Sequence, residues 1–137
     1  MPRSAKKQKL ATVDARDLEN ETIKNNSYRR VVHTVPDQFQ LVLMSLNEDE
    51  NIPREIHPHT VQFIRVERGH ARVTVNDVDV YELSDGASIT IPPNNYHFVD
   101  NITPGSKKTD RKLKLYTIYT PPEHPPTRHQ ARQPLVE

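Results

Sequence analysis

The sequence predicts an all-β protein built as an antiparallel sandwich or barrel, and three observations lead to this prediction. Short segments rich in β-branched and aromatic residues follow one another through the middle of the chain. Stretches with turn-forming chemistry, such as "SDG" and "PPNN", separate these segments. Strand and helix patterns do not alternate, which argues against a parallel sheet.

The expected elements can be taken in order. A short helix beginning at Asp14 or Asp17, or else a loop, comes first. Strands are expected at about Arg30–Thr34, Gln38–Ser45, Gln62–Glu67, Ala71–Val75, Val78–Leu83, Ser88–Ile91, His97–Asn101 and Lys112–Thr120. The stretches between them, "NEDENIPRE" included, are expected to be turns or loops. The chain has only 3 glycines, so Asn76–Asp77 and Asn94–Asn95 are expected to occupy turn positions that glycine usually takes.

The two ends differ in composition from this body. Residues 1–12 form a Lys-rich arm without periodicity, which we expect to be a disordered basic extension. Residues 13–122 form the single domain that a chain of this length predicts. Residues 123–137 form a proline-rich tail, because proline at this density cannot supply ladder hydrogen bonds. The tail is expected to drape over the domain or a partner subunit, with its charged side chains solvated rather than covering a barrel mouth.

Composition narrows the range of functions. The formal net charge is +1, which provides no overall field for nucleic acid. No apolar run approaches the roughly 20 residues that span a bilayer, and no secretory signal is recognisable. The chain has no cysteine, so disulfides and thiolate metal sites are excluded, and a cytoplasmic location is expected.

One segment, "EIHPHTVQFIRVERG", concentrates possible metal ligands. Glu55 and His57 share parity if the segment is extended, and His97 opens a later strand after a proline-rich turn. In "QFIRVE", Gln62 falls on the same face as the Ile and Val side chains and therefore points inward. A buried amide without partners costs about 1–3 kcal/mol, so a hydrogen-bond partner or a metal ion should satisfy it.

Two motifs in this order resemble those of the cupins, which are small jelly-roll β-barrels with a metal site inside the barrel. The first cupin motif is commonly His-x-His, three or four residues, Glu, six residues, Gly. Here Glu55 replaces the first His and Gln62 replaces the Glu, with His57 and Gly69 in register. The second motif is matched by Gly86, Pro92, Asn94, His97 and Asn101, with Asn94 in place of a glycine. The resemblance spans about residues 39–122 and implies a double-stranded β-helix.

The resemblance also implies a site. Its ligands would be Glu55, His57, Gln62 and His97, holding one divalent transition metal ion such as Mn, Fe, Ni or Zn. His59 falls one spacing too late and is expected to be a bystander or to contact a ligand. Gln62 as a hydrogen-bonded amide and Glu55 as a loop carboxylate are the alternatives.

The function implied is an enzyme acting on a small polar, sugar-like or anionic molecule, with isomerase-like or dioxygenase-like chemistry. The alternative is a non-catalytic, metal-stabilised module that binds a sugar or a protein. The chain is similar to a subgroup of small cupins described as resembling mannose-6-phosphate isomerase. A homodimer is expected, whereas membrane and nucleic-acid partners are not.

Overall fold

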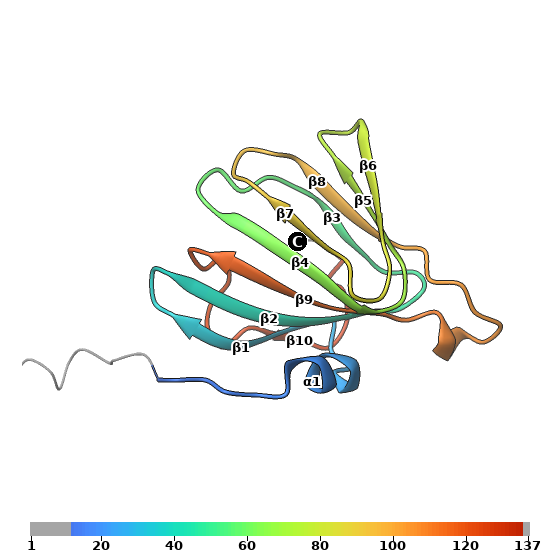
Figure 1. Cartoon of the computed structure of the whole chain (residues 1–137), viewed down its shortest axis with the longest axis horizontal. Coiled ribbons are helices and arrows are strands. Elements are labelled where there is room, and N and C mark those ends of the chain that lie inside the picture. The colour runs from blue at the N-terminus through green and yellow to red at the C-terminus, as the bar shows by residue number, and fades with distance from the viewer. Residues whose placement is uncertain (1–11, 136–137) are drawn as a thin grey trace, which may run out of the picture.

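The computed structural model describes residues 12–135, in which two antiparallel sheets face each other (Figure 1). The six-stranded sheet has the order β10-β1-β2-β9-β4-β7, and the four-stranded sheet has the order β3-β8-β5-β6. The predicted all-β, antiparallel fold class is therefore confirmed. The predicted basic arm falls almost entirely outside the described residues. No helix among the described residues is long and apolar enough to cross a membrane.

The strands follow the expected segments closely, with two additions. They are β1 Arg29–Val35, β2 Phe39–Leu46, β3 Asn51–Glu55, β4 Val61–Arg68, β5 Ala71–Val75, β6 Asp79–Leu83, β7 Ser88–Ile91, β8 His97–Asn101, β9 Leu113–Thr120 and β10 His129–Gln130. The stretch expected to be a loop contains β3. Pro53 is tolerated there because β3 is an edge strand whose register with β8 shifts between Ile52 and Glu55.

The helix α1, Leu18–Lys24, begins after Asp17, whose carboxylate accepts a hydrogen bond from the Asn20 amide at 3.4 Å. Of the two expected starts, Asp17 is thus the correct one. Figure 1 shows α1 on the outer side of the six-stranded sheet, away from the space between the sheets. A 3-10 helix at Lys108–Asp110 precedes β9.

The core lies between the two sheets, where aliphatic side chains from both are fully buried. These include Val42, Met44, Ile52, Ile64, Val66, Val73, Val99, Leu113 and Leu115. Apolar residues fall on both faces of β9, so the sequence alone does not tell which face points inward, and the structure settles it. Thr117 and Tyr119 continue the inward row of β9 and are buried, whereas Tyr116 and Ile118 lie on the outer face and are only half-buried.

Residues other than glycine take several left-handed turn positions, as expected. Asn76, Asp77 and Asn94 have φ values of 52°, 64° and 67°. The expectation fails for Asn95, which does not have a positive φ. Its side chain instead donates a hydrogen bond to the carbonyl of Pro92 at 3.0 Å, which closes the turn before β8.

The C-terminal segment packs on the domain, which confirms the expected draping. The Gln40 side chain accepts from the amides of Glu123 and His124 at 3.2 and 2.9 Å and donates to the His124 carbonyl at 2.6 Å. Further along, Gln133 accepts a hydrogen bond from the Asn51 amide at 2.8 Å. The expectation of solvated charged side chains is therefore wrong at His124, which is half-buried, whereas Glu123 is exposed as expected. The predicted boundary between domain and tail stays a prediction.

Candidate functional site

Three of the four predicted ligands meet at one end of the four-stranded sheet. Glu55 is the last residue of β3 and lies opposite His97, the first residue of β8. His57 follows β3 directly, where Pro58 favours an extended chain. The facing sheet supplies Gln62, which lies opposite Tyr119 of β9.

The side chains of Glu55, His57 and His97 converge. Their ligand atoms all lie within 4.8 Å of one another. The Oε1 atom of Glu55 is 3.2 Å from Nε2 of His57 and 3.4 Å from Nε2 of His97. Both imidazoles are buried, whereas Glu55 retains some exposure. Two buried imidazole nitrogens and one carboxylate oxygen are therefore directed at one common position.

Two buried polar atoms at this point have no hydrogen-bond partner among the described residues. One is Nε2 of His97, because Nδ1 of the same ring donates to the Asn95 carbonyl at 3.0 Å and leaves the Nε2 lone pair free. The other is Oε1 of Gln62, whose Nε2 donates to the hydroxyls of Thr117 and Tyr119 at 3.1 and 3.3 Å. Buried acceptors left unpaired are costly, so this geometry fits a cation with free coordination positions.

Electrostatics favour an ionised carboxylate in the cluster. Burial raises the pKa of Glu55, but the neighbouring imidazoles of His57 and His97 outweigh it and bring that pKa down to about 2. Burial lowers the pKa of His57. The Glu55 carboxylate, together with Glu123 and Gln62, raises this pKa by more, so the net shift is upward. Glu55 is thus a carboxylate at neutral pH, as a metal ligand must be.

Sequence reasoning missed the contribution of the C-terminal segment to this site. Oε1 of Glu123 lies 3.3 Å from Nδ1 of His57, on the opposite side of the ring from Glu55. The ring of His124 stands edge-on to Tyr119, with centroids 5.2 Å apart. Burial, followed by the charge of Arg29, lowers the pKa of His124 to about 4, so its imidazole is neutral at pH 7. The only signal in the sequence was the position of "PPEH" directly after the strand that carries Tyr119.

The remaining motif residues serve the scaffold. Gly69 and Gly86 have φ values of 107° and 88°, which disfavour any other residue. The Asn101 amide donates to three backbone carbonyls, those of Leu46, Asn47 and Arg111. His59 is exposed and takes no part in the cluster, in line with its expected role as a bystander.

Comparison with known proteins agrees with the fold. Residues 42–109 match the family model described as a cupin domain. The protein L612 of Acanthamoeba polyphaga mimivirus is 46% identical over 120 residues, which cover 86% of this chain and 71% of that protein.

Solved structures are similar as well. The crystal structure of BH2720 from Bacillus halodurans is 37% identical, with a TM-score of 0.79, covering 87% of this chain and 89% of that one. An RmlC-like cupin with a double-stranded β-helix from Methanocaldococcus jannaschii has a TM-score of 0.57 at 15% identity, covering 83% and 91%. The latter likeness concerns the fold alone.

Proposed function

The chain belongs to the cupin family, and on this premise we propose that it is an enzyme that binds one divalent transition metal ion and acts on a small polar or anionic molecule. The ligands proposed are Glu55, His57, Gln62 and His97. The observation that carries the proposal is the convergence of three ligand atoms within 4.8 Å beside two buried acceptors without partners.

The donor set suits a borderline metal ion. Two imidazoles, one carboxylate and one amide, with no thiolate in the chain, are compatible with Mn, Fe, Ni or Zn. A single carboxylate against a divalent ion leaves a residual charge near +1, which favours anionic or chelating ligands. When bound, the ion would supply Lewis acidity for isomerase-like chemistry, or oxygen activation in dioxygenase-like chemistry if it is iron.

Other side chains of the chain support a catalytic role over a purely structural one. Glu123 would hold the His57 ring by accepting a hydrogen bond from Nδ1, the arrangement that commonly orients a ligating imidazole. Burial and the Glu55 charge raise the pKa of Tyr119, so its hydroxyl stays protonated and can donate. The neutral His124 beside it can accept a hydrogen bond.

Finer points of the proposal rest on the sequence resemblance. They are the similarity to the subgroup described as resembling mannose-6-phosphate isomerase, a sugar-like or anionic substrate, a homodimer and a cytoplasmic location. The alternative function, a non-catalytic metal-stabilised module, would require that the bound ion offer no position to a small molecule.

Cobalt(II) loaded into the purified protein tests this point, because its visible spectrum reports coordination. Wild type and the control His59→Ala should show a ligand-field spectrum that changes when a small dicarboxylate is added. His97→Ala should show neither the spectrum nor the change. A cobalt spectrum that no small anion alters would refute the enzyme proposal and leave the binding module. No cobalt uptake would refute the metal site itself.

A further inference from the structure

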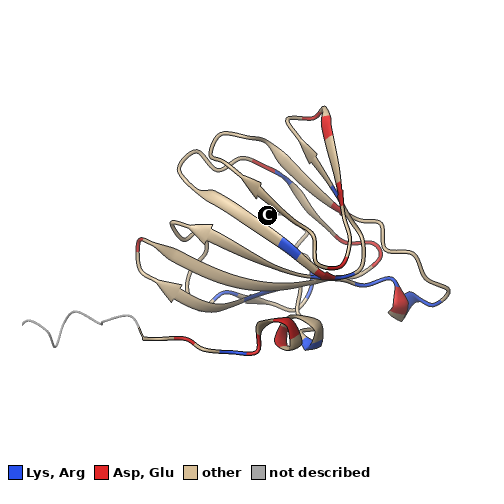
Figure 2. Cartoon of the chain, in the orientation of Figure 1, with Lys and Arg blue, Asp and Glu red and all other residues tan. Residues whose placement is uncertain are grey.

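A second pocket, on the outer face of the six-stranded sheet, is strongly cationic. It has a volume of about 440 Å³ and lies between α1 and the chain leading into β9. Four cationic side chains line it, Lys24, Arg68, Lys112 and Lys114, against a single carboxylate, Asp110. Figure 2 shows Lys and Arg positions at the end of α1 and before β9 on the same side of the molecule.

Lys114 is the most unusual of these residues because it is a buried ammonium without a counter-ion. Its side chain is only 7% exposed. Its three donors go to neutral oxygens: the Asn25 carbonyl, Oδ1 of Asn26 at 3.1 Å and Oγ of Ser45 at 2.9 Å. No carboxylate pairs with it among the described residues.

The charges nearest to Lys114 make its situation less favourable. Burial, then the cations Lys112 and Arg68, lower the pKa of Lys114 to about 8. Neither neighbour forms an ion pair with any residue that the structure describes, and the same holds for Lys24. A negative charge brought into this pocket would therefore compensate several cations that the protein itself leaves unbalanced.

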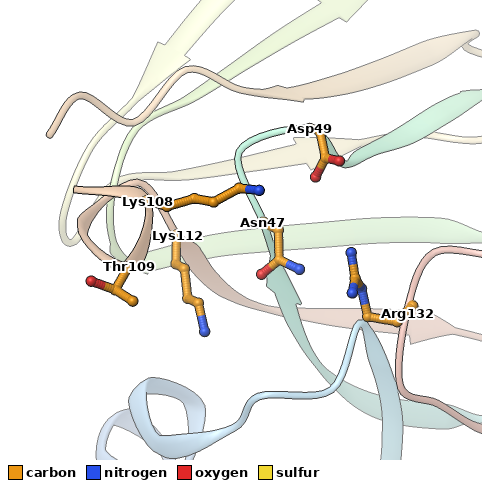
Figure 3. A pocket seen from close by; sticks show the side chains of 6 residues that line it. All are labelled: Asn47, Asp49, Lys108, Thr109, Lys112 and Arg132. Carbon is orange, nitrogen blue, oxygen red and sulfur yellow. The ribbon is translucent and has the colours of Figure 1, made fainter. Parts of the chain in front are cut away.

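A smaller pocket adjoins this cationic pocket and extends the positive surface. It has a volume of about 240 Å³ and shares Thr109 and Lys112 with its neighbour. Figure 3 shows Lys108 and Lys112 pointing in different directions, with Arg132 on the far side of the smaller pocket. Each pocket has one carboxylate, but the smaller one has three cationic side chains and the larger one has four, so the larger one is the stronger candidate for an anion.

We propose that the larger pocket binds an anion of the phosphate class, as the free ion or as the phosphate group of a small molecule, through hydrogen bonds from Arg68 and Lys112 and the nearby charge of Lys114. A guanidinium provides a planar pair of donors for two phosphate oxygens, and ammonium groups provide point charges. The combination of both around a partly enclosed volume matches a compact oxyanion better than a flat, fully solvated surface would.

This pocket is separate from the proposed metal site. Lys114 lies near the start of β9 on its outer face, whereas Thr117 and Tyr119 lie towards the end of the strand on the inner face. The inference therefore does not depend on the proposed function. His97→Ala, which removes a proposed metal ligand, should bind phosphate as wild type does.

Calorimetric titration of metal-free protein at low ionic strength tests the proposal. Inorganic phosphate and glycerol phosphate are the two probes, and the tighter one tells whether the ligand is the free ion or a phosphate ester. Arg68→Gln and Lys112→Gln should each weaken binding about tenfold. Lys107→Gln, an exposed lysine that does not line the pocket, is the matched control and should bind as wild type.

Four results would overturn the proposal. They are no binding of either probe at millimolar concentration, equal affinity in wild type and both variants, loss of binding in His97→Ala, and binding of a single-stranded oligonucleotide without binding of either small probe. The last would make the surface a nucleic-acid site instead. Arg68→Lys should retain part of the phosphate affinity, because lysine keeps the positive charge but lacks the planar pair of donors of the guanidinium.

Discussion

Replacing Gln62 by Leu separates a metal-ligating amide from a purely structural one. The side chain is fully buried and leucine has a similar size, so the substitution changes polarity more than packing. In the metal-free protein it removes the two hydrogen bonds to Thr117 and Tyr119. It also removes the buried Oε1 atom that lacks a partner.

These two effects have opposite signs in the metal-free protein. Two hydrogen bonds at about 0.5–1.5 kcal/mol each cost roughly 1–3 kcal/mol of the free energy of unfolding. Removal of one unsatisfied buried acceptor raises the free energy of unfolding by about 1–3 kcal/mol. The metal-free stability of Gln62→Leu should therefore lie close to that of wild type, within about 2 kcal/mol. In Gln40→Leu, where all the amide's hydrogen bonds are satisfied, the loss should reach at least about 2 kcal/mol.

The metal-bound protein should behave differently. Loss of a ligand should weaken metal affinity about tenfold or more, which removes roughly 1.4 kcal/mol of the stabilisation that a saturating metal provides. Thermal unfolding with and without metal, together with a competition titration against a chelating dye, measures both quantities. Unchanged metal affinity together with a metal-free destabilisation of 2–3 kcal/mol would refute the reasoning and assign Gln62 a structural role only.

Three further substitutions have definite expected outcomes. Glu123→Ala should weaken metal affinity about tenfold, because His57 loses the carboxylate beside its Nδ1 atom. Equal metal affinities of Glu123→Ala and His59→Ala, measured by competition with a chelating dye, would contradict this. Gly69→Ala should lower the melting temperature far more than Gly86→Ala. A Cβ at Gly69 would lie 2.7 Å from a threonine hydroxyl, whereas nothing lies within 4 Å at Gly86; equal melting temperatures would count against this. The pKa of Lys114 is about 8 in the folded protein, below its ordinary value of 10.5. Between about pH 8 and 10.5 the folded state therefore binds fewer protons than the unfolded state, and the free energy of unfolding should rise with pH. Denaturant unfolding should show this rise in wild type relative to Lys114→Met, and a flat difference would contradict it.

Much of the fold followed from local pattern, and the exceptions have identifiable causes. Alternation placed Gln62 on the same face as Ile64 correctly, because one face of β4 is buried. The strand β3 was missed because Pro53 and its charged neighbours resemble a loop, and only its edge position makes proline acceptable. The inward face of β9 could not be assigned from the pattern, because Tyr116 and Ile118 on one face compete with Leu113, Leu115, Thr117 and Tyr119 on the other.

The candidate site, like the fold, could be predicted only in part from the sequence. Motif spacing predicted that Glu55, His57 and His97 come together, and the structure shows the three side chains converging. The approach of Glu123 to His57 was not predictable, because it depends on hydrogen bonds between Gln40 and a segment more than 80 residues away. Long-range contacts of this kind leave no periodic signal in the sequence.

The metal content of untagged protein, purified without added metals, tests the central claim most directly. Wild type and His59→Ala should each contain close to one equivalent of a single transition metal by elemental analysis. His57→Ala and His97→Ala, correctly folded by circular dichroism, should contain almost none. Absence of metal from wild type even after reconstitution, or full occupancy in both ligand variants, would contradict the account.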